Sequence, residues 1–189
     1  MQAFFSSTLL VAAAEVGDKT QLLSFVLAAR LRKPWPILAG ILAATALNHL
    51  LAGTVGVLMA KMLAPEALAW IVGLSFIAFG LWALKPDRLE GAPVLHSAGV
   101  FMTTFVAFFI AEMGDKTQFA TVALAARYDA LAQVVVGTTL GMLVANAPAV
   151  WVGERLSQRL PMRGIRFFAA ALFLIMGVLT LFSAGGRDG

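Results

Sequence analysis

Two copies of one charged motif stand out in the sequence. The first runs Glu-Val-Gly-Asp-Lys-Thr-Gln over residues 15–21, and the second runs Glu-Met-Gly-Asp-Lys-Thr-Gln over residues 112–118. Each copy offers two carboxylates, one ammonium group and the neutral oxygens of threonine and glutamine. An all-oxygen set of donors without sulfur suits a hard divalent cation such as calcium, manganese or magnesium.

The four acids of the motifs are the predicted metal ligands. In each copy the glutamate and the aspartate are three residues apart, so on a continuous helix they would project from one face. If the two copies meet, four carboxylates converge, and with two lysines their charges sum to −2, which one divalent cation neutralises. The predicted ligands are Glu15, Asp18, Glu112 and Asp115, with Lys19, Thr20, Gln21, Lys116, Thr117 and Gln118 as supporting residues.

The supporting residues admit more than one role. The lysines either pair with carboxylates in a structural network or take part in gating, and Glu15 and Lys19 have the favourable i, i+4 order for a helical pair. The glutamines are ligands or interhelical hydrogen-bonding groups. A glycine inside each motif either allows two backbones to approach closely or lets the helix distort.

Three further polar residues, Asn48, His49 and Asn146, lie in later apolar segments. The asparagines are expected to form interhelical hydrogen bonds or to line the pathway. His49 offers a nitrogen ligand or a proton acceptor.

The composition of the whole sequence indicates that these charges lie within a membrane protein. Apolar residues make up 60% of the 189 residues, charged residues only 13%, and the mean hydropathy is +0.88. Soluble domains contain about 45–50% apolar and about 25% charged residues, so this is an integral membrane protein. A charge at the centre of a bilayer costs about 2.5–3.5 kcal/mol, which makes the motif residues functional candidates.

Composition also excludes several classes of protein. The chain has no cysteine, which rules out disulfides, zinc–thiolate sites and iron–sulfur clusters. The net charge of +4 does not indicate nucleic-acid binding, because the basic residues fall in short loops between apolar segments. We expect no cofactor.

Six apolar segments are long enough for membrane helices, since about 20 residues cross the hydrocarbon core. They are predicted at Phe4–Ala29, Ile37–Ala60, Ala67–Leu84, Ala98–Ala126, Ala130–Gly153 and Ile165–Ser183. The two motifs lie near the middle of the first and fourth segments.

The two halves of the chain repeat each other. A shift of 97 positions, the distance from Glu15 to Glu112, also superposes Gly40 on Gly137 and Gly80 on Gly177. Because each half has three helices, the second half must enter the membrane from the opposite side. The sequence thus predicts an all-α membrane protein with six transmembrane helices as two inverted three-helix repeats, an architecture of many secondary transporters. The single membrane domain, residues 1–189, divides into a first repeat (1–84), a central cytoplasmic loop (85–97) and a second repeat (98–189).

The distribution of lysine and arginine predicts the orientation. Basic residues concentrate in the connections after the first, third and fifth segments, which places these in the cytoplasm and both termini outside. This set comprises Arg30, Arg32, Lys33, Lys85, Arg88, Arg155, Arg159, Arg163 and Arg166, against Lys61, Arg127 and Arg187 on the other side.

The doubled E-x-G-D-[KR]-[TS] motif, present at residues 15–20 and 112–117, resembles that of the Gdt-type divalent-cation transporters of the calcium/cation antiporter superfamily. This family includes Golgi calcium–manganese transporters and bacterial manganese exporters, and the resemblance covers nearly the whole chain. It implies exchange of a cation for protons, with the four motif acids as the ion site. Eukaryotic members of the family often carry longer N-terminal and central segments. Because this sequence lacks them, it resembles the bacterial members, and we expect a multi-pass protein of the bacterial inner membrane.

The resulting hypothesis is a secondary transporter that moves manganese or calcium out of the cytoplasm in exchange for protons. The alternative is a proton-coupled exporter of a small organic cation or amino acid, whose site would keep a gap for the solute. An enzyme such as an intramembrane lipid-phosphate phosphatase is not expected, because that chemistry requires an arginine beside the acids and no arginine lies at a helix centre. The partners are the metal ion, protons and the lipid bilayer; the sequence leaves the oligomeric state open.

Overall fold

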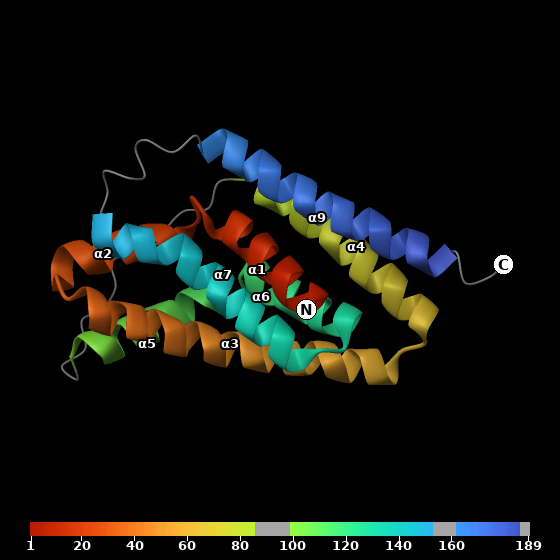
Figure 1. The fold of residues 1–189 in the computed structure, drawn as a ribbon, viewed down its shortest axis with the longest axis horizontal. Helices are drawn as coiled ribbons and strands as arrows, with labels where there is room; N and C mark the ends of the chain where they lie inside the picture. The colour runs from red at the N-terminus through yellow and green to blue at the C-terminus, as the bar shows by residue number, and fades with distance from the viewer. Residues whose placement is uncertain (86–98, 153–161, 186–189) are drawn as a thin grey trace.

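The computed structural model describes residues 1–85, 99–152 and 162–185, and these ranges contain helices and no strand. Figure 1 shows them as an elongated bundle. The helices are α1 (Gln2–Glu15), α2 (Lys19–Leu31), α3 (Pro34–Met62), α4 (Pro65–Ala83), α5 (Val100–Glu112), α6 (Lys116–Tyr128), α7 (Leu131–Val152) and α9 (Met162–Gly185).

Four helices among the described residues are long and apolar enough to cross a membrane: α3, α4, α7 and α9. They correspond to the second, third, fifth and sixth predicted segments. α5 is a shorter apolar helix. Large apolar side chains cover the outside of the bundle, with Trp35 72% exposed and Phe182 76% exposed, as lipid contact requires.

The first and fourth predicted segments are not continuous helices, which corrects the expectation from the sequence. α1 ends at Glu15 and α2 begins at Lys19, and in the second half α5 ends at Glu112 and α6 begins at Lys116. In both gaps the glycine has a positive φ, 84° at Gly17 and 75° at Gly114, which no right-handed helix contains. The consequence is that Glu and Asp of one motif do not share a helix face.

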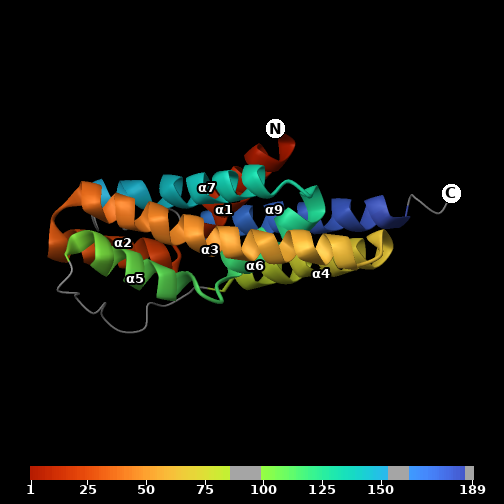
Figure 2. The ribbon, with the colours of Figure 1, turned by 90° about the horizontal axis from the view of Figure 1, so that it is seen from below.

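The helices of the two halves are interleaved. α1 and α2 of the first half pack on α7 of the second, and α5 and α6 of the second half pack on α3 of the first. α4 and α9 lie side by side along one edge of the bundle (Figure 1), and the second view shows α3 between α7 and α6 (Figure 2). Each motif is therefore held by a helix from the other half.

Glycines at corresponding positions permit this close packing. A methyl group added at Gly40 of α3 would lie 2.9 Å from the carbonyl oxygen of Phe101 in α5. One added at Gly137 of α7 would lie 2.6 Å from the carbonyl oxygen of Phe4 in α1. The glycines that the 97-residue shift superposes thus make equivalent contacts.

Some expectations fall outside the described residues. Of the predicted central loop 85–97, only Lys85 is described, and Arg88, Arg155, Arg159, Arg187 and His96 lie outside the described ranges. The six spans, the inversion of the repeats and the placement of the termini remain predictions.

Candidate functional site

Both motifs lie where a helix is interrupted, and this places their acids at helix ends. Glu15 and Glu112 are the last residues of α1 and α5, whose final carbonyl groups carry partial negative charge. Asp18 and Asp115 directly precede α2 and α6, where the free amide groups favour a carboxylate. The interruptions thus surround the acids with polar backbone groups inside an apolar bundle.

Three of the four predicted ligands come together. One carboxylate oxygen from each of Glu15, Asp18 and Asp115 lies within 4.8 Å of the others, a spacing at which three oxygens can hold one metal ion. Glu15 is fully buried, Asp18 is 2% exposed and Asp115 is 1% exposed. The fourth acid, Glu112, is buried but is not part of this trio.

The lysines pair across the two motifs. Lys19 Nζ lies 2.8 Å from Asp115 Oδ1, and Lys116 Nζ lies 2.8 Å from Asp18 Oδ1. The expected pairing of Lys19 with Glu15 along one helix is replaced by this reciprocal exchange, because the helix is broken between the two residues. Each motif therefore supplies the counter-charge of the other.

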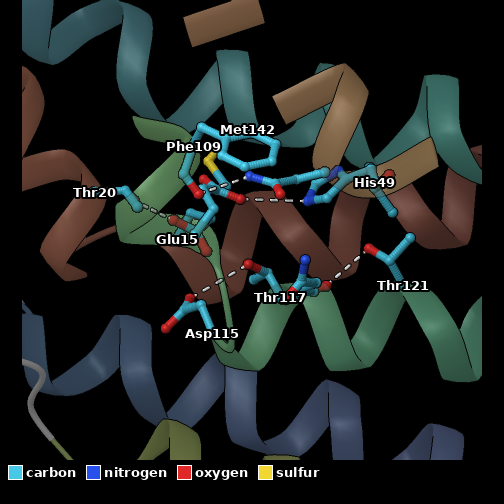
Figure 3. A network of polar contacts seen from close by, with 12 residues as sticks. Glu15, Thr20, His49, Phe109, Asp115, Thr117, Thr121 and Met142 are labelled. Atoms are coloured by element: carbon cyan, nitrogen blue, oxygen red, sulfur yellow. Dashed lines mark hydrogen bonds and ion pairs between the residues drawn. The ribbon is translucent and has the colours of Figure 1, made fainter. Parts of the chain in front are cut away.

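The threonines and glutamines act within their own motifs. Thr20 donates a hydrogen bond to Glu15, and Thr117 donates a hydrogen bond to Asp115 at 3.4 Å (Figure 3). The Oε1 atoms of Gln21 and Gln118 accept hydrogen bonds from the backbone N–H groups of the glycines, Gly17 at 2.9 Å and Gly114 at 2.7 Å. The glutamine oxygens thus stabilise the helix breaks, a role beyond the two suggested by the sequence, which were ligands or interhelical hydrogen-bonding groups.

Glu112 faces a histidine of α3. His49 Nε2 lies 3.6 Å from Glu112 Oε2, and neither side chain is exposed. Beside it, Asn48 Nδ2 donates to the carbonyl oxygen of Phe109 at 3.1 Å, in the last turn of α5 (Figure 3). The sequence offered His49 as a nitrogen ligand or a proton acceptor, but its proximity to Glu112 was not predicted.

The equivalent position of the second half is Asn146 in α7. Its Oδ1 accepts a hydrogen bond from Ser24 of α2 at 2.8 Å, and its Nδ2 donates to the carbonyl oxygen of Met142 at 3.0 Å. Gln21 Nε2 donates to the neighbouring carbonyl oxygen of Ala145 at 2.8 Å. The two asparagines thus form the interhelical hydrogen bonds that the sequence suggested as one of their two roles.

A pocket leads to the first motif. It reaches Gly17, Asp18 and Lys116, and Lys85 and Arg166 line it as well. The ion pair between Asp18 and Lys116 is therefore approached from the end of the bundle where α4 ends and α9 begins.

The chemistry of this arrangement is suited to binding a cation. Glu15 Oε1 and both oxygens of Glu112 are buried without a hydrogen-bond partner among the described residues. Buried carboxylate oxygens are normally paired or bound to metal, because leaving them unpaired is costly. The donor set of carboxylates, hydroxyl groups and backbone carbonyls fits a hard divalent cation.

Comparison with known proteins identifies the family. The sequence model of the family described as "Divalent cation/proton antiporter GDT1" matches the chain twice, at residues 3–91 and 100–188. The two matches are offset by 97 residues, as are the two motifs. No solved structure matches the chain.

Relatives are found in bacteria and plants. A protein of Vibrio cholerae named "Putative manganese exporter" is 51% identical over 173 residues, which cover 91% of this chain and 86% of the relative. A GDT1-like protein of Synechocystis is 27% identical over 95% of this chain and 97% of its own length. GDT1-like protein 5 of Arabidopsis thaliana is 26% identical over 96% of both chains. With its doubled motif, its buried acids and these matches, the chain belongs to the GDT1 family of divalent-cation transporters.

Proposed function

We propose that this protein exports manganese or calcium from the cytoplasm in exchange for protons, and that Glu15, Asp18, Glu112 and Asp115 bind the cation. The observation that carries the proposal is the buried trio of carboxylates with its two crossed lysine pairs. The family description names cation/proton antiport, and the name of the Vibrio cholerae relative supports manganese as cargo and export as direction.

The charges in the site explain how cation and protons are coupled. Four carboxylates and two ammonium groups leave two negative charges, which either a divalent cation or two protons can neutralise. Metal binding requires ionised carboxylates, so protons and metal compete for the same oxygens. This competition links cation movement in one direction to proton movement in the other.

A purely structural role fits the site less well. An apolar core would stabilise this bundle at much lower cost than six charges, since buried ion pairs are at best weakly stabilising. Unpartnered oxygens on Glu15 and Glu112 add to that cost. They are retained, we infer, because a transported cation uses them.

Transport by purified protein in proteoliposomes tests the proposal. Metal uptake is measured across a series of manganese, calcium and magnesium with an imposed pH gradient, while an internal dye reports proton movement. We expect protons to leave the vesicles as metal ions enter them. Metal movement without any proton movement would indicate a uniporter or channel instead of an antiporter. Transport of an organic cation that does not depend on metal would contradict the proposed metal site.

Binding in detergent tests the competition directly. Affinity for metal should fall as pH is lowered, because protons occupy the carboxylates, and calorimetry in buffers of different ionisation heat should show proton release. Affinity that does not depend on pH, with the same heat in every buffer, would contradict proton exchange at this site.

We further propose that the two halves are inverted in a bacterial inner membrane, with α1–α2 and α5–α6 each crossing it once. α1 alone, with 14 residues, spans about 21 Å, which is too short for a core of about 30 Å, but the broken pair is long enough. Cysteines at Ser6 and Ser183 should react with an impermeant thiol reagent from outside, and one at Arg32 should not. Labelling of only one terminus would contradict the inverted arrangement.

A further inference from the structure

His49 is a buried ionisable group to which the proposed cation site assigns no role. It has no exposed surface, and neither ring nitrogen has a hydrogen-bond partner among the described residues. A histidine that serves packing alone is normally hydrogen-bonded when buried, since an unpaired polar group costs roughly 1–3 kcal/mol. Burying His49 without hydrogen bonds therefore lowers the stability of the fold, and packing alone does not explain a histidine at this position.

Other unpaired atoms converge on the same place. His49 Nε2 is 3.6 Å from Glu112 Oε2, and both oxygens of Glu112 and Oδ1 of Asn48 are buried without a hydrogen-bond partner. A separation of 3.6 Å is too long for a hydrogen bond. Ligand atoms that lie about 2.0–2.6 Å from one cation are about 3–4 Å apart when they are neighbours, so the distance fits two ligands of one ion.

The second half of the chain provides an internal control. At the position equivalent to His49 stands Asn146, whose side chain is held by Ser24 and Met142. The equivalent of Glu112 is Glu15, to which Thr20 donates a hydrogen bond. A neutral asparagine with hydrogen-bond partners is therefore compatible with this helix packing, and the histidine is present in one half only.

We propose that His49 is a nitrogen ligand of the transported cation, together with Glu112, and that it makes the site prefer transition-metal dications such as manganese over calcium and magnesium. Calcium and magnesium take oxygen ligands. Manganese also prefers oxygen, but as a first-row transition metal it gains more from one imidazole nitrogen than calcium or magnesium does. This inference rests on the proposed cation site and names the residue that sets its selectivity.

Spectroscopy of bound manganese tests the ligand directly. The protein, purified without a histidine tag, is loaded with Mn²⁺, and electron spin echo spectra are recorded with histidine in natural abundance and labelled with ¹⁵N. The chain has two histidines, His49 and His96. We expect a nitrogen coupling that changes on labelling, persists in His96→Gln and disappears in His49→Gln. Absence of a histidine coupling in the wild-type protein would overturn the proposal, and this result does not depend on the folding of any variant.

Binding measurements test selectivity. His49→Gln replaces the imidazole by an amide and should weaken Mn²⁺ binding at least tenfold. Loss of a group that only hydrogen-bonds to a metal ligand already lowers metal affinity by about tenfold or more. Ca²⁺ binding should stay within about twofold of wild type, and His96→Gln should change neither. Equal weakening of both metals would contradict a role in selectivity. Asp18→Asn should weaken both metals; if it weakens neither, the cation site itself is wrong, which is a different failure.

Discussion

The two motifs have the same polar residues but different surroundings. In the first, Glu15 receives a hydrogen bond from Thr20 and belongs to the acid trio. In the second, Glu112 lies outside the trio and faces His49. The lysines differ too, since the side chain of Lys19 is 24% exposed and that of Lys116 only 4%. A repeated motif thus supplies two unequal half-sites, and neighbouring helices rather than the motif determine the difference.

The largest effect on transport is expected at the aspartates, because each motif contributes its aspartate to the acid trio. Asp18→Asn and Asp115→Asn should each lower metal transport at least a hundredfold, because each removes a negative charge from the same trio. Both variants should still elute as folded protein, and Glu66→Gln, which changes an exposed acid of α4, should transport normally. Full transport by either aspartate variant would mean that the trio is not the site.

Replacing the two lysines should affect the stability of the protein unequally, because their side chains differ in burial. Lys116→Gln breaks an almost fully buried ion pair, a change that costs about 3–5 kcal/mol, and Lys19→Gln should cost less because its side chain reaches solvent. Thermal unfolding in detergent measures both. Adding Asp18→Asn to Lys116→Gln should recover most of the lost stability while transport stays absent. Equal losses for the two lysines would contradict the asymmetry.

The helix breaks should respond alike in both halves. Gly17→Ala and Gly114→Ala place a side chain at positive φ, which costs roughly 1–2 kcal/mol. At Gly114 nothing lies within 4 Å of an added methyl group, so the cost there is conformational. Gly114→Asn should be tolerated better, since asparagine enters this region more readily. An alanine variant as stable as wild type would show that the break does not require glycine.

The smallest effect is expected beside Asn146. Ser24→Ala removes one hydrogen bond to its side chain and should lower stability by about 1 kcal/mol with transport nearly unchanged. Parallel transport and unfolding measurements separate the two effects. A strong loss of transport would place the Ser24–Asn146 pair on the cation pathway and would make the two half-sites more alike than proposed.

The sequence predicts some of these features because they depend on spacing alone. The constant shift of 97 positions and the charged motifs in apolar segments were sufficient to predict a helical membrane protein and to indicate its family. The comparisons confirm the family, and the described residues are helical. Among the described residues, four of the six predicted segments are helices long and apolar enough to span a membrane. The lengths of apolar segments carry this information directly.

Other features depend on contacts between distant residues. The glycine in each motif signalled a possible break, but segment length favoured a continuous helix, and only the positive φ at Gly17 and Gly114 decides the matter. The pairing of Lys19 with Asp115 joins residues in different halves, so local spacing pointed instead to Glu15. The approach of His49 to Glu112 likewise needs the packing of α3 on α5.

The helix breaks lie near the middle of each broken stretch, and this position determines how membrane voltage would act on the cargo. α1 has 14 residues and α2 has 13, so a cation held between them would sit about halfway through the electric field. Moving one charge through 100 mV involves about 2.3 kcal/mol, so a divalent cation would meet about that much in each half of its journey. Two protons returning along the same path would cancel this electrical work. Under the proposed exchange, the sensitivity of transport to voltage would therefore report the number of protons moved per metal ion.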